Sequence, residues 1–392
     1  MKIAVLVSGG VDSSVALALL KEQGHDLTAF YLKIWLEDEL SYLGQCPWEE
    51  DLAYVRSVCE QLDIPLKVVS LQKEYWDQVV AYTMAEIKSG RTPNPDVLCN
   101  QRIKFGMFFN HIDPSLHLSG SFHPSHKALE DMADSLALRS SKSEVEASSG
   151  GQVPYDKVAT GHYAQVVQDE QGISHLMRAP DPIKDQTYFL SYLSQTQLSR
   201  ALFPIGHLPK EKVRELARHY NLPNKDRKDS QGICFLGKLK FNDFIASHVG
   251  QQPGDLIEYE TGNVLGTHKG FWFHTIGQRQ GSGLAGGPWY VVAKDVKGNK
   301  VFISRNYYSP DKQRNTFIVS DCNWLTGIAP AKTDLQVKLR HGKHIYDCIV
   351  VQLDATRWQV TLAQDDQGIA PGQFAVFYDV QECLGAGIIS ND

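Results

Sequence analysis

A short stretch of glycine and serine near the start of the chain restricts its possible folds most strongly. The apolar run Ile3 to Val7 is followed by Ser8-Gly9-Gly10-Val11-Asp12-Ser13-Ser14 and then by the apolar run Val15 to Leu20. Two adjacent glycines permit a turn with positive φ and bring peptide N–H groups close to a ligand. The helix that follows presents unpaired N–H groups and the positive end of its dipole. These features predict a strand, a phosphate-binding loop and a helix.

The loop differs from the two commonest phosphate-binding motifs, since neither G-x-x-x-x-G-K-[ST] nor G-x-G-x-x-G is present. A carboxylate beside phosphates requires a cation between them, so Asp12 predicts a Mg²⁺ ion held jointly with the phosphates. The simpler interpretation is a capped helix start in a serine-rich turn. The stretch S-G-G-V-D-S-S directly after a buried strand is more specific than that, and it resembles the pyrophosphate loop of ATP pyrophosphatases. That resemblance implies ATP as the ligand.

Strands and helices alternate in the first part of the chain. Strands are expected at 27–35 and 64–69, and helices at 48–62 and 73–88. Such alternation predicts an α/β fold with a doubly wound parallel sheet and a ligand at the carboxyl ends of its strands. From about residue 255 short β segments and glycine turns dominate. We therefore expect a catalytic domain at 1–205, a small central domain at 206–309 and a C-terminal β-barrel at 310–392.

Two segments of the first domain depart from regular structure by their composition. Pro93 and Pro95 flank Asn94, and we expect them to hold an extended, stiff loop over 89–100 that positions Asp96 and Cys99. The serine-rich stretch 113–154 is expected to be a surface insertion that is partly disordered, with a short helix at 129–138. It is assigned no chemistry.

Composition narrows the class of protein. Apolar residues make up 42% of the 392, and the absence of a long apolar run predicts no membrane span. The predicted strand at the N-terminus leaves no room for a leader, so we expect a cytoplasmic protein, or one of the plastid stroma after cleavage. The seven cysteines include no C-x-x-C pair, which favours free thiols in a reducing compartment. The net charge of −6 argues weakly against nucleic acid, although the stretch 218–240 is basic.

Cys99 and Cys234 are the candidate reactive thiols, because each lies among Asp, Asn, Gln or Gly rather than on an apolar face. A nucleophilic thiol needs a nearby cation or a helix N-terminus to lower its pKa, and Arg102 and Lys228 are close in sequence. Buried structural thiols are the commoner outcome. That outcome is expected for Cys59, Cys322, Cys348 and Cys383, and Cys46 is undecided.

Six motifs occur in one order along the chain and carry a resemblance to a family. They are SGGVDSS at 8–14, TPNPDVLCN at 92–100, ATGHYA at 159–164, KDQTYFL at 184–190, DSQGICF at 229–235 and HTIGQRQG at 274–281. Together they resemble the tRNA-specific 2-thiouridylases, over essentially the whole chain apart from the insertion. The stretch 31–51 is most similar to the cyanobacterial and plastid branch.

The resemblance implies a reaction and its participants. ATP adenylates the C2 oxygen of the wobble uridine, position 34, in lysine, glutamate or glutamine tRNA. Cys234 receives a persulfide from a cysteine desulfurase or a sulfur-relay protein, Cys99 is the catalytic nucleophile, and Asp96 is the general acid/base. Sulfur reaches C2 directly from the persulfide or after its release as sulfide, and a Cys99–Cys234 disulfide remains that needs a reductant.

The resemblance also assigns binding residues. Nucleotide contacts fall on Leu6, Val7, Ser8, Gly9, Gly10, Val11, Asp12, Ser13, Leu32 and Gly161. The target base, turned out of the anticodon loop, is expected to meet Asn94, Pro95 and Asp96. Further tRNA contacts fall on Lys184, Asp185, Gln186, Arg340 and His341. The family more often has Arg-Tyr at the last two positions. Without the resemblance, Lys184 and Arg340 would be equally well explained as exposed charges.

Two other functions remain open from the residues alone. Another ATP pyrophosphatase, such as an amidotransferase-type synthetase or a lysidine-forming enzyme, would use the same loop without needing two loop cysteines. A nucleotide- or RNA-binding module would carry a degenerate loop, and the intact Ser8 and Asp12 argue against it.

Overall fold

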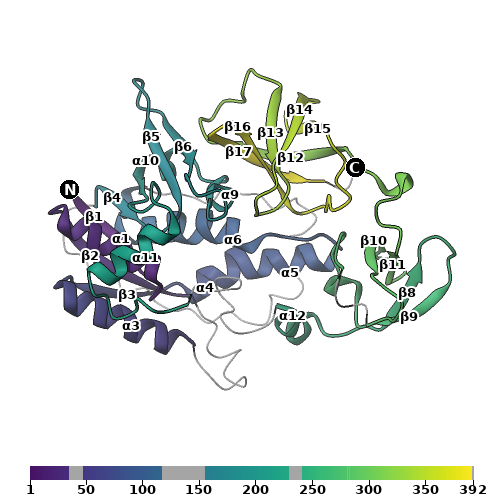
Figure 1. Cartoon of the computed structure of the whole chain (residues 1–392), viewed down its shortest axis with the longest axis horizontal. Helices are drawn as coiled ribbons and strands as arrows, with labels where there is room; N and C mark the ends of the chain where they lie inside the picture. Colours follow the sequence, from purple (N-terminus) through teal and green to yellow (C-terminus); the bar gives the residue numbers. More distant parts are fainter. Residues whose placement is uncertain (35–46, 117–154, 229–240, 280, 282, 391–392) are drawn as a thin grey trace.

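The computed structural model describes residues 1–34, 47–116, 155–228, 241–279, 281 and 283–390. Three bodies follow one another along the chain (Figure 1): an α/β body, a small β body and a β-barrel. Both the predicted short helix at 129–138 and Cys234 lie outside the described residues. Within the described chain, no helix combines the length and the apolar character that crossing a membrane requires.

The α/β body is built on a five-stranded parallel sheet in the order β3-β2-β1-β4-β7. Its strands are β1 (Lys2–Leu6), β2 (Asp26–Lys33), β3 (Leu66–Ser70), β4 (Lys157–Ala159) and β7 (Ala201–Leu202). The chain builds outward from β1 to β3 and then returns to the other side of β1 for β4. This reversal is a topological switch point, where α/β sheets bind their ligands.

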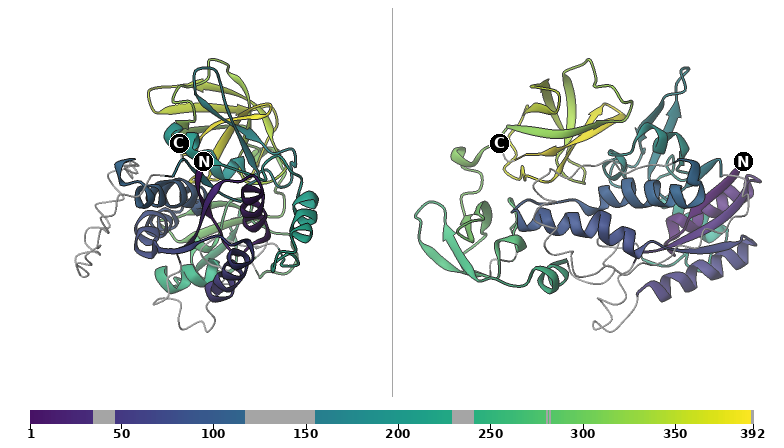
Figure 2. Two further views of the ribbon diagram at one scale, coloured as in Figure 1. Left: turned by 90° about the vertical axis from the view of Figure 1, so that its left-hand side faces the viewer. Right: turned by 180° about the vertical axis from the view of Figure 1, so that it is seen from behind.

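Helices cover both faces of this sheet, which confirms the doubly wound fold (Figure 2). Ile3 and Val5 of β1 face one core with α1 (Val11–Glu22), α3 (Pro47–Leu62) and α11 (Lys210–His219). Ala4 and Leu6 face the other core, because side chains alternate along a strand. The helical segments of that second core include α4 (Gln72–Tyr75), η2 (Trp76–Val80), α5 (Ala81–Lys88), α6 (Pro95–Leu98), η3 (Cys99–Met107), α7 (Phe108–Ile112) and α9 (Thr187–Leu190).

The prediction of an extended, stiff loop over 89–100 is wrong for the second half of that segment. The chain is helical from Pro95, and Asn94 caps this helix by accepting a hydrogen bond from the Val97 amide at 3.4 Å. Proline is compatible with the first helical position because its missing N–H would have no partner there. Asp96 and Cys99 therefore lie three residues apart on continuous helical backbone rather than on an extended loop.

The two later bodies confirm the predicted change to β structure. The central sheet has the order β10-β11-β8-β9, and the barrel has the order β12-β15-β14-β13-β16-β17, closed by pairing of β12 with β17. The central strands are β8 (Gly254–Glu258), β9 (Val264–His268), β10 (Tyr290–Asp295) and β11 (Lys300–Ser304), preceded by helix α12 (Phe241–Val249). The barrel strands are β12 (Thr316–Trp324), β13 (Asp334–Lys338), β14 (Tyr346–Gln352), β15 (Arg357–Leu362), β16 (Phe374–Asp379) and β17 (Glu382–Ile389).

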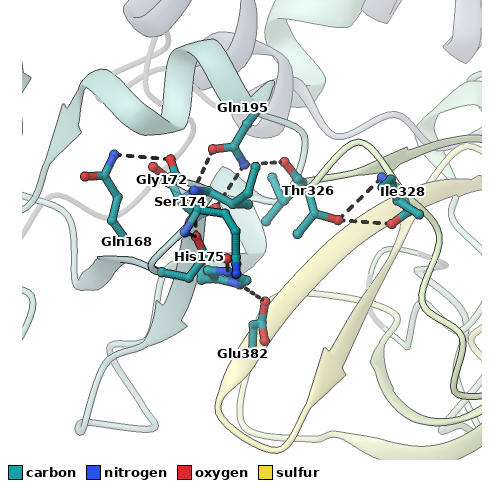
Figure 3. A network of polar contacts seen from close by, with 12 residues as sticks. Gln168, Gly172, Ser174, His175, Gln195, Thr326, Ile328 and Glu382 are labelled. Atoms are coloured by element: carbon teal, nitrogen blue, oxygen red, sulfur yellow. Dashed lines mark hydrogen bonds and ion pairs between the residues drawn. The ribbon is translucent and has the colours of Figure 1, made fainter.

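A hairpin from the α/β body extends the barrel sheet. Its strands are β5 (Ala164–Gln168) and β6 (Ser174–Arg178), and β6 pairs with β17. Figure 3 shows the polar contacts at this junction, where His175 Nδ1 lies 2.6 Å from Glu382 Oε1. Gln195, on α10 (Gln195–Arg200), donates to the carbonyl of Ser174 on β6 at 3.0 Å and to that of Leu325 beside the barrel at 2.8 Å. The barrel is thus attached directly to the α/β body.

Candidate active site

The glycine loop joins the carboxyl end of β1 to α1, as predicted. Gly9 has a φ of 77°, and a Cβ there would lie 2.6 Å from the backbone oxygen of Asp51. Only glycine satisfies both conditions at this position. The Ser13 hydroxyl accepts from the Ser8 amide at 3.2 Å and donates to the carbonyl of Gly10 at 3.1 Å, so the serines shape the loop from within.

A segment more than 200 residues away in sequence fixes the outer side of this loop. Asn224 donates to the carbonyl of Gly9 at 2.8 Å and to the Ser14 hydroxyl at 2.9 Å. Arg227 donates to the same Gly9 carbonyl at 3.0 Å and forms an ion pair with Asp51. These contacts hold the Gly9 carbonyl toward 224–227. The N-terminus of α1, which follows the loop, favours an anion.

Gly161 lies two residues after β4 and packs against the glycine loop at the switch point. A Cβ at this glycine would lie 2.6 Å from the amide nitrogen of Ser13 and 2.8 Å from the carbonyl carbon of Asp12. The two loops therefore touch backbone to backbone at the carboxyl edge of the sheet. Leu32 lies next to last in β2 at the same edge, and Val7 donates to the Phe30 carbonyl at 2.9 Å. The predicted nucleotide residues are thus gathered at one edge.

Asp12 is paired with groups that sequence reasoning did not identify. Lys210 Nζ lies 2.7 Å and 2.9 Å from its two carboxylate oxygens, and the Tyr163 hydroxyl donates to Oδ1 at 2.9 Å. An ammonium group already balances this carboxylate, and the described residues include no cluster of three acidic, His or Cys side chains able to hold a metal. The arrangement therefore does not fit a protein-built Mg²⁺ site at Asp12.

Cys99 is the first residue of η3, and its side chain lies in the apolar core. Its side chain has no exposed surface. Burial raises the pKa of the Cys99 thiol to about 11; Lys104 acts in the opposite direction, and the charge of Asp96 adds to the increase. The thiol is therefore protonated near neutral pH and needs a change in its surroundings to react.

Two charged residues connect Cys99 with other parts of the site. Lys104, on the same helix, lowers the pKa of Cys99 and also that of His162, which burial already holds well below its usual value. His162 follows Gly161 of the nucleotide edge. The charge of Asp96 raises the pKa of Cys99 and also that of His341 of the barrel.

Contacts give the position of the helix: Phe105 and His162 both pack on Phe203, with ring centroids 6.2 Å and 5.9 Å away. Asn100 donates at 3.1 Å to the carbonyl of Phe189, on which His341 stacks. The helix that carries Cys99 therefore lies between the nucleotide edge and the barrel.

The barrel presents its predicted tRNA residues to the start of this helix. His341 stacks on Phe189, with ring centroids 4.5 Å apart and planes at 28°. Burial, with Lys338 adding to it, lowers the pKa of His341, so the neutral imidazole is favoured. Arg340 is half exposed and forms an ion pair with Asp366 at 2.7 Å. A histidine therefore provides an aromatic stacking surface where the family more often has tyrosine.

The predicted tRNA segment 184–186 has mixed surroundings. Lys184 is partly exposed, whereas Asp185 is 1% exposed and lies against Lys338 and Arg178. Gln186 accepts from the Tyr163 amide through Oε1 at 2.9 Å. Of the three, the Asp185 carboxylate has no access to a ligand in this arrangement. Direct contact of 184–186 with tRNA remains a prediction.

Sequence reasoning missed three residues of the site: Lys210, Tyr163 and Lys104. Lys210 and Tyr163 contact Asp12 from far along the chain, and Lys104 affects Cys99 from within the same helix. No local motif predicts such interactions. The one available signal was ATGHYA, which includes Tyr163 but does not predict the direction of its hydroxyl.

Comparisons with known proteins match the chain along its whole length. Residues 1–144 and 141–238 match the family model of the tRNA methyl transferase HUP domain, 242–305 that of the tRNA methyl transferase PRC-barrel domain, and 314–389 that of the aminomethyltransferase beta-barrel domain. A solved U34-tRNA thiolase, NcsA from Methanococcus maripaludis, is 15% identical over 64% of this chain and 65% of its own. Its TM-score of 0.30 is too low to bear on the fold.

Curated relatives are much more similar. The tRNA-specific 2-thiouridylase MnmA of Parabacteroides distasonis is 41% identical over 100% of this chain and 99% of its own length. The tRNA-specific 2-thiouridylase MnmA 1 of Bacteroides thetaiotaomicron is 40% identical over 100% of both. Identity at this level over complete lengths establishes that the chain belongs to the tRNA-specific 2-thiouridylase family.

Proposed function

We propose that this chain uses ATP to replace the C2 oxygen of the wobble uridine, position 34, of tRNA with sulfur. The relatives that match its whole length are named for this activity. The observation that carries the proposal is the place of the Cys99 helix. Phe105 of this helix and His162 at the nucleotide edge both pack on Phe203, and Asn100 of the helix donates at 3.1 Å to the carbonyl of Phe189, on which His341 of the barrel stacks. A base held between these two edges would meet the nucleotide and the thiol together.

The first step needs a nucleotide whose α-phosphorus faces the base. The loop from Ser8 to Ser13 and the N-terminus of α1 would hold the phosphates by their amides, as the anion-binding geometry favours. The uridine C2 oxygen attacks the α-phosphorus and pyrophosphate leaves, which gives an O-adenylated uridine. Lys210 is the cation nearest to the loop carboxylate and would supply positive charge there. Mg²⁺ is expected to enter with the phosphates of ATP.

The second step transfers sulfur at the level of a persulfide. The terminal sulfur of a Cys234 persulfide attacks C2, and AMP leaves with the former C2 oxygen. The Cys99 thiolate then attacks Cys234 Sγ, so the transferred sulfur is released on the uridine in reduced form and a Cys99–Cys234 disulfide forms. The alternative order releases sulfide first, and that sulfide attacks C2. Both routes consume two thiol electrons, so a reductant must reopen the disulfide.

Several finer assignments belong to the same proposal. Lysine, glutamate and glutamine tRNAs are the proposed acceptors, and a cysteine desulfurase or sulfur-relay protein the proposed donor. Asp96 is the proposed general acid/base. We propose the division into domains at 1–205, 206–309 and 310–392, with tRNA contacts from Asn94, Pro95, Lys184, Gln186, Arg340 and His341.

A thiolation assay tests the function. Purified protein is incubated with unmodified glutamate tRNA, Mg-ATP and a persulfide donor, and thiolated tRNA is separated on a mercury-containing gel while AMP is measured by chromatography. We expect a retarded tRNA band and AMP, and in the absence of added reductant the band of free thiolated tRNA is lost in Cys99→Ser. Cys322→Ser on β12 is the control, since it changes a thiol that the proposal does not use.

The assay also separates the alternatives. AMP formation without thiolated tRNA, unchanged by Cys99→Ser, would assign the loop to another carbonyl substrate. If neither product forms while ATP still binds, the chain is a binding module rather than an enzyme.

A further inference from the structure

An ion pair between two fully buried side chains joins the barrel to the segment 184–186. Lys338 Nζ, at the end of β13, lies 3.0 Å from Asp185 Oδ2, and the two side chains are 1% and 0% exposed. Such a pair is unusual, because charged side chains are rarely fully buried. It connects residues 153 positions apart in the chain.

The Asp185 carboxylate is fully engaged within the protein. Arg178 Nε lies 3.3 Å from Oδ2, and the Thr187 hydroxyl and amide donate to Oδ1 at 2.8 Å and 3.3 Å. Lys338 Nζ also lies 5.4 Å from the centre of the Tyr378 ring. Four groups therefore contact this carboxylate, and a tRNA phosphate would also be repelled by it.

Stability alone is a weak explanation for such a pair. Removing two charges from water costs as much free energy as their attraction returns, so a well-packed apolar pair is often as stable. The pair does, however, favour one relative placement of its two elements: Asp185 would keep Arg178 as a partner, but a shift of β13 would take the buried Lys338 ammonium away from the carboxylate that balances it, which is strongly unfavourable. The pair therefore fixes how β13 of the barrel sits on the 184–186 segment.

One side of the pair leads to the nucleotide loop. Gln186, next to Asp185, accepts from the Tyr163 amide at 2.9 Å and donates its own amide to the Tyr163 carbonyl at 2.9 Å. The Tyr163 hydroxyl in turn donates to Asp12 at 2.9 Å. A shift of the 184–186 segment would therefore move the aromatic residue that contacts the loop carboxylate.

The other side leads to the base-binding end of the Cys99 helix. Arg340 and His341 follow Lys338 by two and three residues, and His341 stacks on Phe189 at 4.5 Å. Asn100, the residue after Cys99, donates to the Phe189 carbonyl at 3.1 Å. A shift of β13 would therefore move the His341 ring relative to the helix that carries Asp96 and Cys99.

We propose that Lys338 and Asp185 are a positioning pair that sets the distance between the nucleotide loop and the barrel surface over the Cys99 helix. Asp185 acts through Gln186 and Lys338 and does not contact tRNA. This inference rests on the proposed function, since the two edges that the pair aligns are the proposed sites of ATP and of the wobble base.

Three variants and a matched control test the pair. Asp185→Asn, Lys338→Met and the double variant are compared with Lys332→Met, which removes a lysine from an exposed pair of the same barrel, Lys332 with Asp379 at 2.8 Å. Single-turnover thiolation at saturating tRNA and ATP gives the rate of the chemical steps, and filter binding gives the Kd for tRNA. Amide hydrogen exchange of peptides covering 161–163 and 184–193 reports the position of the segment without any activity.

We expect each single variant to lower the single-turnover rate by about tenfold or more, and the double variant to equal the worse single within about threefold, because two residues that act as a unit do not add. The Kd for tRNA stays within about threefold of wild type, and exchange in both peptides becomes faster. Lys332→Met leaves all three readouts unchanged. Should the charge variants not fold, Thr187→Val removes one donor to Asp185 without changing charge, and we expect the same pattern at about threefold.

Other results overturn the inference. If Asp185→Asn weakens tRNA binding tenfold while Lys338→Met does not, Asp185 contacts tRNA itself. If the rate losses of the single variants multiply in the double variant, the two residues act separately. If wild-type protein makes no thiolated tRNA, the proposed function fails, and the exchange data still decide the positioning role: unchanged exchange in Lys338→Met refutes it.

Discussion

The buried state of Cys99 makes a quantitative prediction about its reactivity. Burial raises the pKa of this thiol from 9.0 to about 11. Only the thiolate reacts with an alkylating reagent, so below pH 9 a shift of two units lowers the reactive fraction about 100-fold. The same shift corresponds to about 2.7 kcal/mol between the two protonation states. Steric protection adds to this factor because the side chain has no exposed surface.

Iodoacetamide labelling measures the effect. Trypsin cleaves after Arg91 and Arg102, so Cys99 is the one thiol of the peptide 92–102, and its alkylation is followed by mass spectrometry. We expect alkylation at pH 7.5 to be at least about 100-fold slower in the folded protein than for the same peptide in urea. Folded and unfolded rates within a factor of ten of each other would refute the reasoning, because the thiol would then be neither buried nor shifted.

Three further perturbations test the site. Gly161→Ala places a methyl group against backbone atoms of the glycine loop, and we expect isothermal titration to show at least about tenfold weaker ATP binding without loss of the fold. Lys210→Met leaves Asp12 without its cation, so we expect weaker ATP binding, with tRNA binding unchanged in a filter assay. Glu382 raises the pKa of His175, so the contact stabilises the barrel junction at low pH and is lost as pH rises through the folded pKa; thermal melts should show this slope flattened in His175→Gln.

The central parts of the fold could be predicted because their signals are local. An apolar strand, a glycine pair and an apolar helix follow one another within the first twenty residues, and the structure has β1, the loop and α1 there. The parallel sheet and the change to β structure could be predicted from the spacing of apolar residues, which can be recognised within a short segment of sequence. Cys99 and Asp96 could be identified as candidate site residues for the same reason, since both belong to the motif at 92–100.

The missed parts depend on contacts between distant segments. The helix start at Pro95 was missed because proline ends regular structure in most positions but begins a helix at the first one. The pairing of β6 with β17 joins Leu176 to Cys383, and no local pattern encodes a partner so far along the chain. Lys210 reaches Asp12 across 198 residues for the same reason. Burial of Asp185 could not be predicted either, since an aspartate in a polar motif is usually exposed.

The raised pKa of Cys99 also discriminates between the two routes for sulfur. If Cys99 must release sulfide from Cys234 before C2 is attacked, the single-turnover rate depends on the Cys99 thiolate. With a pKa of about 11, the rate then rises about tenfold per pH unit between pH 7 and 9. If the persulfide attacks C2 directly, the rate of carbon–sulfur bond formation does not depend on ionisation of Cys99. The rate of product release does depend on it.

The Cys99→Ser variant separates these routes at one pH. Direct attack leaves the uridine joined to Cys234 through a disulfide, so we expect protein-bound tRNA that a reductant frees as thiolated tRNA. Prior release of sulfide requires the missing thiol, so that route gives neither bound nor free product. A wild-type rate that is flat between pH 7 and 9 would contradict prior release of sulfide by a thiolate with a pKa of about 11, and it agrees with direct attack in which formation of the carbon–sulfur bond limits the rate. Alkylation of Cys99 in the tRNA-bound protein over the same pH range measures whether tRNA binding lowers the pKa of this thiol.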